Sequence, residues 1–228
     1  MEEHLLRRFN DESLRGSVHE LEGITAVRCT IAGRMPLPAR PGEWNRLRDC
    51  RAEQCRHENV TLSGVAIERC ELDGLGRAGR NPLFFWGCVF SNVRLCGRLT
   101  GLKINPEYGF LRYDPSRQAQ WVEAMRAFYR DVAWALDISE AEFTSTPTFE
   151  AIPGHLVRRD PSRQVLVRRA ALAGREIRSL PRRIALEWFV ERSPFDSVVI
   201  AGSGRSNRRQ TDLDDMMRLR DMGIAEAD

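Results

Sequence analysis

The sequence predicts a mixed β and α fold, in which a β-rich first part precedes a helical and α/β C-terminal portion. Three patterns predict it. Small or apolar residues recur at every fifth position between about 24 and 95, an apolar stripe of helical spacing follows Asp114, and a strand, a glycine turn and a helix follow one another after residue 197. The composition, 42% hydrophobic and 29% charged over 228 residues, is that of a globular chain with one large or two small domains.

The five-residue period is clearest between Cys50 and Leu75, and it matches neither a helix, with its period of 3.6, nor a strand, with its period of 2. Small or branched residues fill one position, and mostly aliphatic residues follow two places later. The first set is Cys50, Cys55, Val60, Val65, Cys70 and Leu75, and the second is Ala52, His57, Leu62, Ile67 and Leu72. The same frame fits 24–31 and 45–47, breaks at 76–82, and resumes over 83–95.

This spacing resembles that of the pentapeptide-repeat family, over about 24–95 only. The resemblance implies a short right-handed quadrilateral β-helix of parallel strands, in which each pentapeptide forms one side of a square coil and both marked positions point inward. An antiparallel meander is the alternative, because VTL, VAI and CEL also alternate and GRAGRNP can serve as a hairpin loop.

The cysteines fit the small inward position of this frame, as the four at Cys29, Cys50, Cys70 and Cys88 show. Cysteine behaves as a small hydrophobic residue when it is buried. We therefore expect free structural thiols, with no metal site and no cofactor, since no second Cys or His pair lies at a zinc-like interval.

Helices and a linker are predicted after the repeats. An N-cap Asp114 followed by proline begins a helix whose apolar stripe should cover an open end of the stack, and TSTPTFEAIPG is predicted to be a linker. That stripe comprises Trp121, Met125, Phe128, Val132 and Leu136. The second copy of DPSRQ, at 160–164, predicts a short helix to about 173, and another helix is expected from Pro181 to about Arg192. The predicted parts are 1–110, a β-helix-like repeat domain with an N-terminal cap; 111–143, a capping amphipathic helix; 144–159, a linker; and 160–228, the C-terminal portion.

A weak anion site is predicted near the C-terminus. A strand at 198–201 leads into a glycine turn, and Thr211 is expected to begin a helix. Turn amides and nearby arginines can hold a phosphate, although a solvated basic loop gives the same pattern. The candidate residues are Gly202, Ser203, Gly204, Arg205, Arg208 and Arg209. No catalytic residues are predicted, because His4, His19, His57 and His155 lie in unrelated contexts and no nucleophile motif occurs.

The function predicted from these patterns is a non-enzymatic protein-interaction or scaffold module, cytoplasmic, without a membrane segment, whose partner is another protein. An acidic DNA-mimic role is disfavoured, because residues 45–105 hold ten Lys or Arg against six Asp or Glu, a difference of +4. Two alternatives stay open: a phosphate- or nucleotide-binding enzyme that uses the turn at 202–209, and a nucleic-acid-associated protein that uses paired arginines. Those arginines are Arg158, Arg159, Arg168, Arg169, Arg182, Arg183, Arg208 and Arg209.

Overall fold

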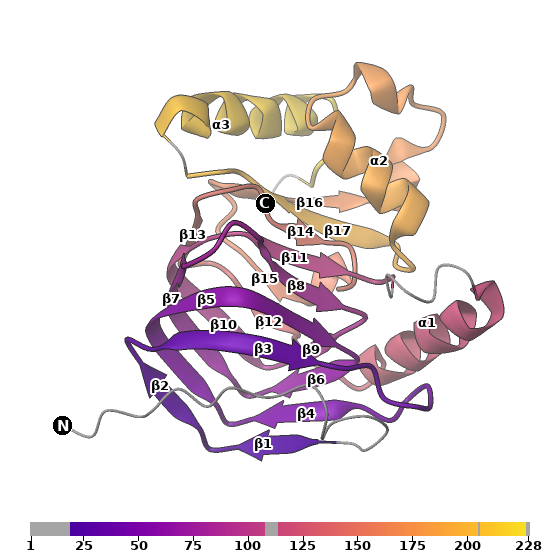
Figure 1. Ribbon diagram of the computed structural model, residues 1–228. Coiled ribbons are helices and arrows are strands. Elements are labelled where there is room, and N and C mark those ends of the chain that lie inside the picture. The colour runs from indigo at the N-terminus through magenta and orange to yellow at the C-terminus, as the bar shows by residue number, and fades with distance from the viewer. Residues whose placement is uncertain (1–18, 108–113, 205, 227–228) are drawn as a thin grey trace.

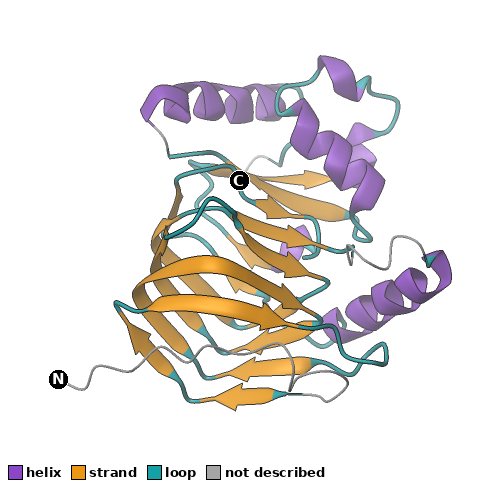
Figure 2. Cartoon of the chain, viewed as in Figure 1, coloured by secondary structure: helices purple, strands orange, loops and turns teal. Residues whose placement is uncertain are grey.

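The structure, a computed structural model, describes residues 19–107, 114–204 and 206–226, and its main feature is a stack of short parallel strands in two curled sheets (Figure 1). The smaller sheet has the order β1-β4-β6-β9. Its strands are β1 (Glu20–Glu22), β4 (Asn45–Arg48), β6 (Val65–Glu68) and β9 (Val89–Ser91). Helices lie beside the stack and over one end of it (Figure 2).

The larger sheet has the order β14-β11-β8-β5-β7-β10-β12-β15, with β2 and β3 also pairing β5, and β13 also pairing β10. Its early strands are β2 (Thr25–Val27), β3 (Thr30–Met35), β5 (Arg51–Ser63), β7 (Glu71–Arg77), β8 (Leu83–Trp86), β10 (Val93–Leu99) and β11 (Leu102–Asn105). Its late strands are β12 (Leu136–Asp137), β13 (Ala141–Phe143), β14 (Thr148–Phe149) and β15 (Val157–Arg158).

The strands from β1 to β15 pair only in parallel among the described residues, so the antiparallel-meander alternative is wrong. Partners lie 20 residues apart in the best-matched part, as in Asn45 with Val65. The offset grows to 23 for Ala66 with Val89, because extra residues follow β7.

The chain bends at regular intervals because residues with positive φ recur every five places. The series runs over Gly23, Arg28 and Gly33; over Asp49, Gln54, Asn59, Gly64, Arg69 and Gly74; and over Gly87, Asn92 and Gly97. Most of these residues are Gly, Asn or Asp, the types that adopt the left-handed conformation most readily. Most of these bends directly precede one of the small positions of the five-residue frame, which explains why the period is neither 2 nor 3.6; Gly33 and Gly97 precede arginines instead.

The inward positions of the frame form the interior of the stack. Cys55, Val65 and Ile67 are buried, whereas Arg56 and Arg69, which lie between inward positions, are exposed. The frame therefore predicts part of the buried set: Ala66, between two inward positions, is also buried, and the inward Leu62 and Cys70 are only partly buried. Towards the first coil the cover is thinner, and Cys29, Ala26 and Ile31 are only partly buried.

Helix α1 (Pro115–Tyr129) begins where it was predicted, with the Asp114 carboxylate accepting a hydrogen bond from the Arg117 N–H. It lies beside the stack near β6 and β9 (Figure 1), and its buried Tyr129 hydroxyl accepts a hydrogen bond from the Phe90 N–H at 3.2 Å. The prediction that this helix covers an open end is therefore wrong. The helix is also shorter than predicted, because Leu136 belongs to β12. The predicted N-terminal cap falls on residues outside the described ranges.

The segment 144–159 is packed structure instead of a linker. It contributes β14 and β15 to the larger sheet and a 3₁₀ turn, Gly154–Leu156, between them. Phe149 and Ile152 are almost fully buried. The threonines and prolines that suggested a linker here flank short strands at the end of the stack.

The C-terminal portion covers one end of the stack (Figure 1). It consists of the antiparallel pair β16 (Gln164–Arg168) and β17 (Ser197–Ala201), with α2 (Arg183–Arg192), α3 (Ser206–Asp221) and two 3₁₀ turns. Packing is so close that a Cβ on Gly154 would lie 2.6 Å from Leu166 Cδ1 and 2.7 Å from the Val198 nitrogen. None of the described helices is long and apolar enough to cross a membrane.

Two predictions about this portion are wrong. The second DPSRQ forms a turn that leads into β16, because the apolar run Val165–Val167 favours a strand, whereas the first copy precedes a helical pattern. Helix α3 begins at Ser206, five residues before the predicted Thr211. The predicted helix up to Arg192 and the predicted strand at 198–201 are confirmed as α2 and β17.

Candidate functional site

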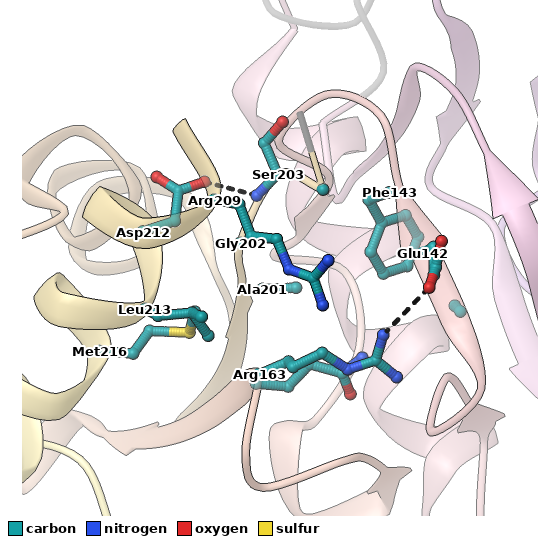
Figure 3. Close-up of a pocket in the computed structure, with 13 residues that line it drawn as sticks. Glu142, Phe143, Arg163, Ala201, Gly202, Ser203, Arg209, Asp212, Leu213 and Met216 are labelled. Atoms are coloured by element: carbon teal, nitrogen blue, oxygen red, sulfur yellow. Dashed lines mark hydrogen bonds and ion pairs between the residues drawn. The ribbon is translucent and has the colours of Figure 1, made fainter. Parts of the chain in front are cut away.

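The predicted glycine turn lies beside a small pocket of about 50 Å³ between β13, β17 and α3 (Figure 3). Gly202, Ser203, Gly204 and Arg209 line it, whereas Arg208 is exposed and does not. Arg205 lies outside the described residues. The other lining residues are Ala141, Glu142, Phe143, Arg163, Gln164, Ala201, Asp212, Leu213 and Met216.

The turn amides that were expected to bind an anion are bonded within the chain. The Ser203 N–H donates to Asp212 Oδ2 at 2.5 Å, and the Gly204 N–H donates to the Phe143 carbonyl at 2.5 Å. Arg182 Nη1 in turn donates to Asp212 Oδ1 at 2.6 Å, and both of these side chains are only 9% exposed. The buried Asp212 carboxylate therefore takes the position in this turn that a bound anion would need.

The pocket itself has mixed charge. Arg209 and Arg163 reach into it from different elements, and Glu142 faces Arg163 (Figure 3) at 3.8 Å. Arg163 also donates to Asp160 at 2.6 Å. A volume of about 50 Å³ is well below the roughly 300–1,000 Å³ of ordinary ligand sites. The pocket can hold a few waters or one small group, not a nucleotide.

The paired arginines that were considered for nucleic-acid contact are mostly engaged by the protein. Arg158 lies 4.3 Å from the Trp134 ring centroid, and Arg169 donates four hydrogen bonds to backbone carbonyls. Carboxylates pair with Arg168, Arg182 and Arg183. Arg159 also has a partner, so Arg208 and Arg209 are the two of the eight that lack one among the described residues.

All six cysteines are free; Cys55, Cys88 and Cys96 are buried, whereas Cys29, Cys50 and Cys70 are only partly buried. Burial raises the pKa of Cys88 to about 12 and that of Cys96 to about 11, so these thiols stay protonated at neutral pH. Cys50 contacts Cys70 one coil away, and this contact lowers the pKa of Cys50 to about 6 while it raises that of Cys70. Among the described residues, no group of three or more His, Cys, Asp or Glu side chains is placed to hold a metal ion.

The outward faces of the stack carry ladders of ion pairs. Arg69 forms a bidentate pair with Asp49, at 2.7 and 2.8 Å, across one strand spacing. Glu68 accepts from both Arg46 and Arg48, and its side chain is only 14% exposed. Most charge on these faces is therefore neutralised by a neighbouring strand.

On one face of the stack the arginines lack carboxylate partners among the described residues, and the sequence-based prediction missed this face. A shallow groove of about 460 Å³ crosses β5, β7 and β10, and Arg56, Arg77 and Arg98 line it. None of these three guanidiniums pairs with a carboxylate of the described residues. The sequence contains a signal for this groove, because the three arginines are 21 residues apart, close to the 20-residue offset between β5 and β7.

Glycines open the floor of this groove. Gly74, at φ +71°, and Gly76 leave backbone where side chains would stand, and a Cβ at Gly76 would lie 3.4 Å from Arg56 Cγ. Two of the three arginines are also held by hydrogen bonds, because Arg56 Nη2 donates to the Arg77 carbonyl at 3.2 Å and Arg77 Nη1 to the Arg80 carbonyl at 2.9 Å. The result is a positively charged surface over three adjacent strands.

Comparison of the chain with protein-family models, with curated proteins and with solved structures gave no match.

Proposed function

We propose that this protein is a non-enzymatic protein-interaction or scaffold module, built on a short right-handed β-helix of the pentapeptide-repeat type, that acts in the cytoplasm. Two features support the β-helix. In the best-matched part of the stack, strand partners lie 20 residues apart, which equals four sides of five residues, and left-handed residues recur at every fifth place. Stacked strands about 4.8 Å apart then present outward side chains at fixed intervals on rigid faces.

The observation that carries the binding function is the contrast between the ion-pair ladders and the groove. Arg51, Arg69 and Arg94 have carboxylate partners on the stack or next to it, whereas the three groove arginines have none among the described residues. Exposed charges that are fixed and unpaired attract a partner of opposite charge and give specificity. The groove is also wide and shallow, which suits contact with another macromolecule better than enclosure of a small substrate.

The proposal favours a protein partner over nucleic acid for two reasons. The groove lining, Gln54, Cys55, Arg56, Gly74, Leu75, Gly76, Arg77 and Arg98, contains no aromatic side chain on which a base could stack. Acids also flank the groove, since Glu53 and Asp73 pair side by side on β5 and β7. A long polyanion would be repelled there.

The test uses the purified full chain to capture binding proteins at moderate salt after nuclease treatment. The captured protein is then purified, and the complex is reconstituted from the two purified proteins. We expect a complex of defined stoichiometry at about 150 mM salt, where the Debye length is about 8 Å. Capture that disappears with nuclease, together with oligonucleotide binding that falls steeply with salt, would overturn the proposal in favour of the nucleic-acid alternative.

A further inference from the structure

We infer that the groove over β5, β7 and β10 binds an extended acidic segment of the partner protein. This inference rests on the proposed protein-binding function and names the chemistry of its recognition site. The groove is bounded by Arg56, Arg77 and Arg98, and its floor is the backbone at Gly74 and Gly76. The two glycines add no side chain of their own to this floor, and the Arg56 side chain lies over Gly76.

The spacing of the arginines fits an extended peptide. Arg56, Arg77 and Arg98 come from three adjacent strands, so they span two strand spacings, about 10 Å. An extended chain advances about 3.3 Å per residue, so carboxylates within a stretch of about four residues reach across the same span. Guanidinium groups bind carboxylates through paired N–H donors, which favours Asp and Glu over neutral side chains.

The surroundings limit the length of the segment. Glu53 and Asp73 lie on the same strands toward one edge of the groove, and Glu58 follows Arg56 and His57 on β5. These acids repel a long polyanion that continues past the arginines. A segment with only two or three acidic residues can pair with the groove arginines without approaching these carboxylates.

The buried His57 beneath this face is consistent with a positive field. Burial lowers the pKa of His57, and the nearby charge of Arg77 lowers it further. The charge of Arg77 therefore acts on the side chain that lies beneath the groove.

The experiment uses fluorescence anisotropy of the full chain with a labelled Asp-Ser repeat peptide, its Asn-Ser counterpart as the uncharged probe, and a single-stranded oligonucleotide of equal charge. We expect the acidic peptide alone to bind well. The variant Arg56→Ala/Arg77→Ala/Arg98→Ala should weaken its binding at least tenfold. The matched control Arg51→Ala/Arg69→Ala/Arg94→Ala removes the same charge from three arginines that have carboxylate partners, and it should change affinity less than twofold.

Gly76→Glu provides a second variant that keeps all three arginines while filling and neutralising the groove, and it should also abolish binding. Equal weakening by both triple variants, or no binding of the acidic peptide by the unmodified chain, would overturn the inference. A captured partner protein that binds the groove variant as tightly as the unmodified chain would overturn the groove assignment while the protein-binding function stands. Tighter, groove-dependent binding of the oligonucleotide would overturn both.

Discussion

The five-residue frame makes a sharp prediction for Ile67→Asp, which we expect to be among the most damaging single changes in the stack. Ile67 is 6% exposed and its neighbours along the sheet are Leu47 and Phe90. Loss of the aliphatic contacts costs about 2–3 kcal/mol. Keeping the new carboxyl protonated at pH 7, about 3 units above its ordinary pKa of about 3.9, costs about 4 kcal/mol more at 1.36 kcal/mol per unit.

These two contributions together approach the whole stability of a typical domain, about 5–15 kcal/mol. They also differ in their dependence on pH. Burial raises the folded-state pKa of the new carboxyl, so the unfolded state alone loses its proton between about pH 4 and that raised value. The destabilisation of Ile67→Asp should therefore shrink to the aliphatic part, about 2–3 kcal/mol, near pH 4.

The assay is urea denaturation of each variant, monitored by tryptophan fluorescence at pH 7 and near pH 4. Arg69→Ala, two residues along and exposed, is the matched control and should leave the urea midpoint nearly unchanged. Cys70→Asp, at the next inward position of the frame, should behave like Ile67→Asp. If Ile67→Asp unfolds at the same urea concentration as Arg69→Ala, or if its penalty is equal at the two pH values, the inward assignment is wrong.

Three further predictions concern buried polar groups. Burial and Arg77 lower the pKa of His57, so when the pH falls below the ordinary value of about 6.5, the unfolded state gains a proton that the folded state does not. The melting temperature of the unmodified chain should therefore fall more between pH 7.5 and 5.5 than that of His57→Leu. Equal decreases would contradict this. Tyr129→Phe removes the acceptor of the buried Phe90 N–H and should cost about 1–3 kcal/mol in urea denaturation, whereas a change below about 0.5 kcal/mol would argue against that bond. Arg182→Ala leaves the buried Asp212 carboxylate without its ion-pair partner and should lower the free energy of unfolding by about 3–5 kcal/mol. Adding Asp212→Asn should restore much of this stability. No recovery would mean that loss of the ion pair is not the cause.

The sequence alone predicted the inward positions of the stack because burial there follows a simple spacing. Cys55, Val65 and Ile67 occupy the frame as expected. The left-handed residues were a missed signal, since Gly64, Gly74 and similar residues stand one place before most of the small positions. Gly64 shows why some of these must be glycine: at φ +60°, its Cβ would also lie 2.7 Å from Leu37 Cδ1.

Local patterns failed where packing between distant segments decides the structure. In both copies of the motif DPSRQ, the aspartate, Asp114 or Asp160, accepts hydrogen bonds from the serine hydroxyl of the motif and from a backbone N–H. Only the first copy begins a helix. The residues after each copy of the motif, and the segments that they pack against, determine the outcome. The candidate anion turn failed for a related reason, because the carboxylate that bonds Ser203 comes from Asp212 on the helix, and spacing alone does not reveal that contact.

The arginine groove lies where the strand partners of its arginines carry no carboxylate. Where the offset between strands is 20, Arg51 stands beside Glu71 and Arg48 beside Glu68, so charges are matched between coils. At the same offset, Arg56 stands beside Gly76 and Arg77 beside His57. Arg98 falls between Cys96 and Leu99, where the register between β7 and β10 shifts.

Arg56 and Arg77 therefore lack a carboxylate neighbour because of the residue types at the paired positions, not because the offset changes. The same regular pairing neutralises Arg48 and Arg51, since it places Glu68 and Glu71 beside them. If this reasoning is right, Gly76→Glu, which places a carboxylate beside Arg56 in the unchanged register, should weaken binding of the acidic peptide. Undiminished binding in the folded Gly76→Glu variant would refute it.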